Sequence, residues 1–192
     1  MKVYDISQEI FSCQVYPGDP GPKADALFRM EDGHLYNLSG FWMCAHNGTH
    51  VDAPAHFLQG GKTVEQIPTE HFVGPSYVFR HEGTVTKEDA LSMLQTAGDI
   101  PRILIGGNAV VSLEAAMAFA EAGILLLGNE SQTVGPEDAP MAVHKVLLEA
   151  NVVLLEGIRL DGIPKGEYLL SAAPLNLAGL EGAPCRAVLI EL

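Results

Sequence analysis

The 192-residue sequence is poor in cysteine, in basic residues and in long apolar runs. Its three cysteines cannot all pair with one another and none lies in a Cys-x-x-Cys arrangement, so we expect reduced thiols and a cytoplasmic protein. The first residues, Met1–Asp5, lack the apolar run of a signal peptide. The longest apolar runs, near Ile124–Leu127 and Val152–Leu155, are far too short to span a bilayer. No membrane partner is therefore expected.

Basic residues are scarce because only 11 Lys and Arg stand against 24 Asp and Glu, which gives a formal net charge of −13. A surface of this charge repels phosphate backbones and anionic lipids, which argues against nucleic acid as a partner. The nucleophile motif Gly-x-Ser-x-Gly and the full phosphate-loop motif Gly-x-x-x-x-Gly-Lys-Ser/Thr are also missing, which argues against two common classes of enzyme.

Short aliphatic runs alternate with helix candidates along a chain whose length suits one domain. Thr86 and Ser112 are suited to cap two helices, and Pro140 to the first turn of a third. The alternation predicts an α/β domain with a mixed sheet. The predicted helices cover 87–97, 113–122 and about 140–150, and the predicted strands are Lys2–Ile6, Leu35–Met43, Ser76–Phe79, Ile103–Ile105, Ile124–Leu127, Val152–Leu155 and Ala187–Leu192.

Two segments interrupt this alternation. The segment Val15–Pro22 contains three prolines and two glycines, so it is expected to be a loop. The segment His46–Pro54 follows an apolar strand and carries Gly48, which predicts the irregular end of that strand. Phe41 and Trp42, just before it, would line a pocket or an interface, with core packing expected for at least one of them.

A cluster of potential metal ligands lies in the second of these segments, because His46, His50, Asp52 and His56 fall within eleven residues. If the chain is extended from His50, then His50 and Asp52 point to the same side and Val51 points into the core. Imidazoles and a carboxylate that converge in this way bind Zn²⁺, Mn²⁺ or a similar ion. The alternative is that a chain with seven histidines clusters some by chance.

Other titratable residues have weaker patterns. His34, His71 and His81 lie outside such a cluster of ligand candidates and are expected to be surface or packing residues. Glu156 directly follows an apolar strand, where a carboxylate is costly unless it is solvated or paired. Both readings of Glu156 stay open on the residues alone.

The eleven residues that begin at His46 follow the pattern His-x-Gly-Thr-His-x-Asp-x-Pro-x-His. This pattern resembles the signature of the cyclase family of metal-dependent hydrolases, which includes bacterial-type kynurenine formamidase (arylformamidase) and isatin hydrolase. The resemblance extends along nearly the whole chain, since Val15–Asp19 is similar to the family's N-terminal substrate loop and Leu169–Leu189 to its C-terminal end. It implies one domain over residues 1–192, with a swivelling β/β/α-type α/β fold. It also implies a homo-oligomer, a dimer or a tetramer, in which a neighbouring subunit helps to close the site.

The resemblance implies a role for each ligand. His46, His50 and Asp52 would hold a first metal ion, and Asp52 would bridge to a second ion completed by His144 and Glu156. Zn²⁺ is the expected ion and Mn²⁺ the alternative, with one or two ions per subunit. Such an ion makes hydroxide available at neutral pH.

The resemblance also implies an enzyme, with His56 as the general acid/base and Tyr16 as a wall of the substrate site. The expected reaction is hydrolysis of the C–N bond of a small amide, with N-formylkynurenine of tryptophan catabolism as the reference substrate. Ring opening of a lactam or lactone, as in isatin hydrolysis, is the alternative, and a non-catalytic metal- or ligand-binding module is a third reading. The retention of His56 argues against that third reading, because metal binding alone would not require it.

The sequence departs from the family pattern in places that concern the substrate. Tyr16 stands where relatives with formamidase activity tend to have tryptophan, and Gly128–Gln132 replaces an expected Gly-Ile-Asp pattern. Neither departure touches the expected metal ligands.

Overall fold

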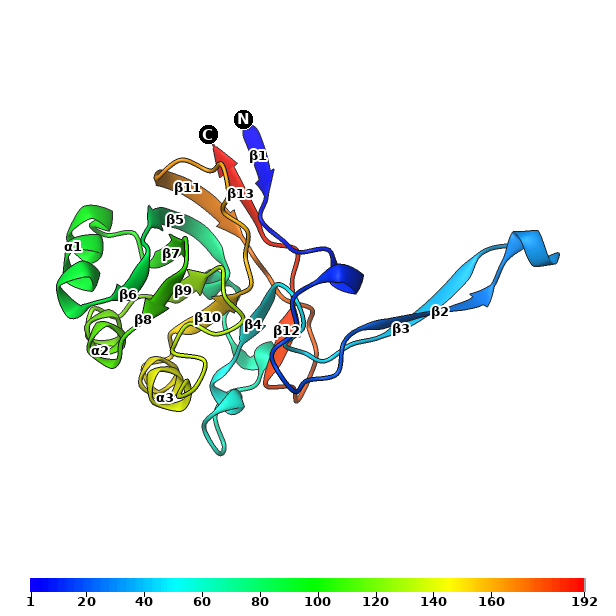
Figure 1. Ribbon diagram of the computed structural model, residues 1–192, viewed down its shortest axis with the longest axis horizontal. Helices are drawn as coiled ribbons and strands as arrows, with labels where there is room; N and C mark the ends of the chain where they lie inside the picture. Colours follow the sequence, from blue (N-terminus) through cyan, green and yellow to red (C-terminus); the bar gives the residue numbers. More distant parts are fainter. Residues whose placement is uncertain (192) are drawn as a thin grey trace.

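A nine-stranded mixed sheet runs through the protein, whose computed structural model describes residues 1–191 (Figure 1). Strands β5, β7, β9 and β10 pair in parallel, and the pairs on either side of them are antiparallel. Because β1 pairs with β13, the two ends of the chain lie side by side. In spatial order the strands are β1 (Lys2–Asp5), β13 (Val188–Glu191), β11 (Gly166–Ser171), β5 (Val73–Arg80), β7 (Arg102–Gly106), β9 (Leu126–Asn129), β10 (Val153–Glu156), β4 (His50–Asp52) and β12 (Gly182–Pro184).

The parallel strands β7, β9 and β10 are buried on both faces, which explains their short aliphatic runs. Along β7, Ile103 and Ile105 pack into the apolar cluster on the helix side of the sheet, whereas Leu104 packs into the cluster on the other side. The same alternation places Leu127 and Leu126 of β9 in opposite clusters. Two apolar clusters therefore hold the sheet rigidly from both sides.

Three α-helices cover one face of the sheet: α1 (Lys87–Ala97), α2 (Leu113–Glu121) and α3 (Met141–Glu149) (Figure 1). The hydroxyl of Thr86 accepts from Asp89 N at 3.2 Å and that of Ser112 accepts from Ala115 N at 3.1 Å, so both predicted caps are confirmed. The short strands β6 (Gly83–Val85) and β8 (Ala109–Val111) pair beside the helices. Within residues 1–191 no helix has the length and apolar character needed to cross a membrane.

The strands β2 (Lys23–Phe28) and β3 (Leu38–Trp42) form a hairpin that projects from the body of the protein, here called the arm (Figure 1). The expectation that Phe41 or Trp42 packs in the core is wrong, because their side chains are 63% and 50% exposed. The predicted strand from Leu35 begins only at residue 38.

The other differences between prediction and structure concern where elements begin and end, and strands that were not predicted. The loop over 15–22 is confirmed, and the expected irregular end of a strand contains the short strand β4. The strand predicted over 124–127 begins only at residue 126. Strands β2, β6, β8, β11 and β12 were not predicted, and the predicted Leu192 lies outside the described residues.

Candidate metal centre

The register of β4 between β10 and β12 places the ligand candidates together. His50 pairs with Glu156 of β10, and Asp52 pairs with Gly182 of β12. Val51, between the two ligand candidates, is fully buried in the apolar cluster opposite the helices. The expected alternation along this segment is therefore confirmed, with both polar side chains directed to one side.

The turn before β4 orients His50. Gly48 has a φ of +65°, a left-handed conformation that glycine adopts without strain. Its carbonyl oxygen accepts a hydrogen bond from His50 Nδ1 at 3.0 Å. This contact fixes the tautomer of His50 and leaves its Nε2 directed at the cluster, as backbone carbonyls do for histidines that bind metal.

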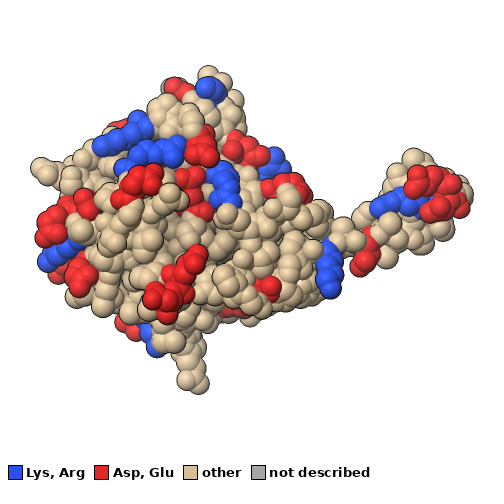
Figure 2. Space-filling model, in the orientation of Figure 1, with Lys and Arg blue, Asp and Glu red and all other residues tan. Residues whose placement is uncertain are grey.

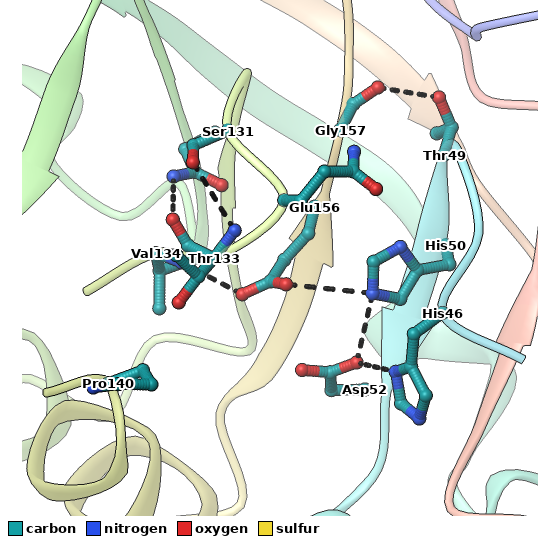
Figure 3. A network of polar contacts seen from close by, with 12 residues as sticks. His46, Thr49, His50, Asp52, Ser131, Thr133, Val134, Pro140, Glu156 and Gly157 are labelled. Carbon is teal, nitrogen blue, oxygen red and sulfur yellow. Dashed lines mark hydrogen bonds and ion pairs between the residues drawn. The ribbon is translucent and has the colours of Figure 1, made fainter. Parts of the chain in front are cut away.

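His46, His50 and Asp52 form the first cluster, whose potential ligand atoms all lie within 4.8 Å of one another (Figure 3). Asp52 Oδ1 lies 2.8 Å from His46 Nδ1 and 3.3 Å from His50 Nε2. The first part of the sequence pattern therefore forms one compact nitrogen and oxygen donor set.

Asp52, His144 and Glu156 form a second cluster of the same kind, again with ligand atoms within 4.8 Å. His144 Nε2 lies 3.2 Å from Glu156 Oε1 and 3.6 Å from Asp52 Oδ2. His144 is presented by α3, where its Nδ1 donates to the Pro140 carbonyl at 2.9 Å. Asp52 thus belongs to both clusters, with one oxygen nearest each.

The side chains present fit divalent metal ions. Asp52 Oδ2 is buried and has no hydrogen-bonding partner within residues 1–191, although buried carboxylate oxygens are normally paired. Imidazole nitrogens and carboxylate oxygens are the donors of zinc and manganese sites. A cation between the clusters would satisfy the orphaned oxygen.

The electrostatics of the cluster also favour a cation. Burial raises the pKa of Glu156, and the adjacent Asp52 carboxylate raises it further. Burial alone would raise the pKa of Asp52, but hydrogen bonds from His46 and His50 outweigh it and hold that pKa well below its usual value. Burial lowers the pKa of His46, yet the Asp52 and Glu181 carboxylates outweigh it and raise the pKa to about 9. Two buried carboxylates therefore draw positive charge to this point.

His56 lies beside the clusters but belongs to neither. It ends a short 3₁₀ helix, Pro54–His56, and its ring stacks on His46 with 4.1 Å between centroids. Burial lowers the pKa of His56 to about 4, below the ordinary value of about 6.5, so the ring is neutral at pH 7. A neutral imidazole at this position is able to accept a proton.

The clusters open onto a cavity of about 250 Å³. Tyr16 lines it from the loop over 15–22, and its hydroxyl donates to the Glu137 carbonyl at 2.9 Å. Phe57, which the sequence analysis did not single out, packs between His56 and His144 with centroid distances of 4.5 and 4.7 Å. Aromatic rings on two sides give the cavity walls suited to a planar ligand.

Glu181 is a second residue that the sequence did not reveal. Its Oε1 lies 3.2 Å from His46 Nε2, the ring nitrogen opposite the one that faces Asp52. A carboxylate in this position orients a histidine ligand and raises its basicity. The one feature of the sequence that points to Glu181 is its position directly before Gly182, within the C-terminal segment that resembles the family.

The segment after β9, which departs from the family pattern, uses its side chains to form hydrogen bonds with backbone groups. Glu130 accepts from the backbone N–H groups of Gly107 at 2.5 Å and Leu160 at 2.7 Å. Asn129 Nδ2 donates to the Thr133 carbonyl at 2.9 Å. These bonds hold the loop that carries Gln132 and Thr133 to the edge of the cavity.

Fold and site together define an α/β protein with a candidate dinuclear metal centre at one side of an aromatic-walled cavity. The chain belongs to the cyclase family, whose model, described as "Putative cyclase", matches residues 4–136.

Relatives and solved structures cover the whole chain. A kynurenine formamidase from Salinibacter ruber is 33% identical over 98% of this chain and 97% of its own length. A solved structure described as a potential metal-dependent hydrolase with cyclase activity has a TM-score of 0.83 at 31% identity, over 98% of this chain and 96% of that chain. Isatin hydrolase A from Labrenzia aggregata has a TM-score of 0.83 at 21% identity, over 98% and 93% of the two chains, and this likeness shows the fold alone.

Proposed function

We propose that this protein is a metal-dependent hydrolase that cleaves the C–N bond of a small amide, with an aryl formamide such as N-formylkynurenine as its reference substrate. The observation that carries this proposal is that Asp52 is shared by two histidine–carboxylate clusters, beside a neutral His56 that belongs to neither. The relative named kynurenine formamidase, similar over almost its whole length, supports the choice of a formamide.

In this account His46, His50 and Asp52 hold one divalent ion, and Asp52, His144 and Glu156 hold a second. Zn²⁺ is the preferred ion and Mn²⁺ the alternative, because nitrogen and carboxylate donors suit both. A divalent ion at such a site supplies hydroxide at neutral pH and polarises the acyl oxygen of the substrate.

The protein's own side chains contribute the proton transfer. His56 starts neutral, accepts a proton as the water attacks, and returns it to the departing nitrogen, which would otherwise leave as an unstable amide anion. Stacking on His46 holds the His56 ring in place while its nitrogens remain free of hydrogen bonds within the described chain. His56 is therefore assigned as the general acid/base.

The substrate is held between aromatic walls. Phe57 lies on the His144 side of the cavity, and Tyr16 reaches in from the loop over 15–22. Flat rings favour an aryl or fused-ring substrate, since stacked aromatic pairs add about 0.5–1.5 kcal/mol beyond buried area. An aliphatic amide of equal reactivity would lack this contribution.

Ring opening of a lactam or lactone would use the same proton transfer and remains the alternative reaction. A direct test measures bound metal together with the hydrolysis rates of N-formylkynurenine, isatin and an aryl lactone. The proposal expects metal and a kcat/KM highest for the formamide. A higher value for isatin would favour the alternative, and bound metal without turnover of any substrate would favour a binding module.

We further propose that the chain forms a homo-oligomer, a dimer or a tetramer, through the arm. Figure 2 shows the arm standing clear of the body, and an uncovered two-stranded hairpin is at best marginally stable in water. Many large apolar side chains exposed on one projecting element are typical of an interface. Its exposed apolar residues are Leu27, Phe28, Met30, Leu35, Tyr36, Leu38, Phe41 and Trp42.

Light scattering of Trp42→Glu, which places a charge on the arm, tests this assembly. The variant is expected to have a lower mass than the wild type. Met117→Glu is a matched control, because Met117 is 55% exposed on α2 and Trp42 is 50% exposed. A monomeric wild type, or equal masses for all three proteins, would contradict an arm-mediated assembly.

A further inference from the structure

Thr133 carries a buried hydroxyl group that the described part of the chain leaves unpaired. The residue is 3% exposed, and its Oγ1 has no hydrogen-bonding partner within residues 1–191. A buried hydroxyl without a partner is costly, so native structures pair nearly all of them. Thr133 lines the same cavity as His56 and His144. A ligand in that cavity is therefore the available partner.

The backbone on both sides of Thr133 is anchored, which fixes where its side chain lies. The Thr133 carbonyl accepts from Asn129 Nδ2 at 2.9 Å, and the next N–H, that of Val134, donates to Glu156 Oε1 at 2.8 Å. Gly157 N donates to the Ser131 carbonyl at 2.7 Å. The hydroxyl is thus preorganised next to a proposed metal ligand.

Thr133 and His56 lie beside different ligand candidates of the centre, Thr133 next to Glu156 and His56 next to His46. Figure 3 shows a row that runs from His46 through His50 to Glu156, with Thr133 on the side of Glu156 away from His50. His56 stacks on His46, at the other end of this row. In an amide the acyl oxygen and the nitrogen leave the acyl carbon in different directions. A substrate whose nitrogen faces His56 is therefore able to direct its acyl oxygen toward Thr133, which lines the same cavity.

The neighbouring residue offers a second polar atom. Gln132 Nε2 donates to the Gly48 carbonyl at 3.2 Å, which leaves Gln132 Oε1 buried and without a partner among the described residues. Gln132 lines the same cavity. Ligand pockets characteristically combine apolar walls with a few polar groups placed in this way.

We propose that Thr133 is a substrate-binding residue whose hydroxyl donates a hydrogen bond to the acyl oxygen of the amide. The inference rests on the proposed function and adds a protein donor at the oxygen side of the reacting bond. Donors held in place at the site of developing negative charge accelerate acyl transfer, because they need not reorganise during the reaction.

The test compares Thr133→Val, which removes the hydroxyl at nearly constant shape, with Thr133→Ser, which keeps it. Thr133→Val is expected to lower kcat/KM for formanilide about tenfold or more, the usual effect of losing one such bond, while Thr133→Ser stays within about threefold of the wild type. Metal content should be equal in all three proteins. Wild-type kcat/KM in Thr133→Val, or a loss that serine does not restore, would overturn the proposal.

Thermal unfolding separates substrate binding from a structural role. Because the Thr133 hydroxyl has no hydrogen-bonding partner among the described residues, Thr133→Val should not lower Tm. Thr49→Val is the matched control, since Thr49 is also buried but its hydroxyl donates to the Gly157 carbonyl at 2.7 Å and accepts from Gln8 N at 2.9 Å. That variant should lower Tm. A fall in Tm for Thr133→Val as large as for Thr49→Val would assign Thr133 to the scaffold instead.

Calorimetric binding of benzamide distinguishes failure of this inference from failure of the proposed function. A wild type that binds benzamide but hydrolyses no amide would end the proposed function, and weaker binding by Thr133→Val, by about tenfold, would still support the hydroxyl contact. Equal affinities of wild type and Thr133→Val for benzamide would contradict the proposed role of Thr133 and leave the proposed function unaffected. A wild type that neither binds benzamide nor hydrolyses formanilide would contradict both.

Discussion

Gly182 lies directly against the ring of His46: a Cβ on residue 182 would stand 2.5 Å from His46 Cε1 and 3.1 Å from His46 Nδ1. Because β12 pairs with β4, this glycine lies next to Asp52, its register partner on the neighbouring strand. The absence of a side chain at 182 thus makes room for the imidazole beside its carboxylate. We regard this packing as part of the metal site.

Gly182→Ala should displace His46 and weaken metal binding roughly tenfold or more, as changes just behind a ligand do. A competitive chelator titration measures the affinity. Gly40→Ala is the control, because a Cβ at residue 40 of the arm would make only an ordinary contact, 3.5 Å from Leu27 Cδ1. Equal affinities for the two variants would mean that His46 does not bind metal in the observed position.

Glu181→Gln should lower metal affinity by about ten- to a hundredfold, because the carboxylate that orients His46 Nε2 loses its charge. The same chelator titration reports the loss. Glu167→Gln, an exposed change on β11, should behave as wild type. If the Glu181 variant retained wild-type affinity, its contact with His46 would be incidental.

His56 and His46 stack on each other yet should fail in different ways when replaced. His56→Ala should keep most of its metal and lose on the order of 10²–10⁴ in kcat, the usual contribution of a general acid/base. His46→Ala should lose metal instead. Metal analysis with steady-state kinetics distinguishes the two, and equal metal loss in both variants would make His56 a ligand.

Tyr16 has two separable groups, a ring in the cavity and a hydroxyl bound to the Glu137 carbonyl. If the ring contacts substrate, Tyr16→Phe should retain kcat/KM and Tyr16→Ala should lose roughly tenfold or more, with metal content unchanged in both. Comparable losses in both variants would show that the tyrosine acts by pinning its loop.

Local patterns in the sequence predicted the parts of the site that depend on local geometry. The alternation of His50, Val51 and Asp52 follows from strand geometry alone, and the structure confirms it. The pairing of His144 with Glu156 came from the family resemblance, because no spacing rule joins a helix face to the end of a strand. The three helices were predictable because capping residues act within one turn.

Other features depend on contacts between distant segments. Glu181 reaches His46 across 135 positions of sequence, and no local pattern marks it. Strand β2 escaped prediction because all six of its residues are exposed, so it lacks the alternation of a half-buried strand. The expectation that Phe41 or Trp42 packs in the core failed because the arm holds both residues away from it.

The most direct test of the metal centre is the metal content and activity of the wild type and of Asp52→Asn, measured before and after chelation. The account predicts one or two divalent ions per wild-type chain, because Asp52 joins two potential ligand groups. It predicts that chelation abolishes hydrolysis, that added Zn²⁺ or Mn²⁺ restores it, and that Asp52→Asn binds little metal and stays inactive. Full activity of the thoroughly chelated wild type, or wild-type metal content in Asp52→Asn, would contradict it.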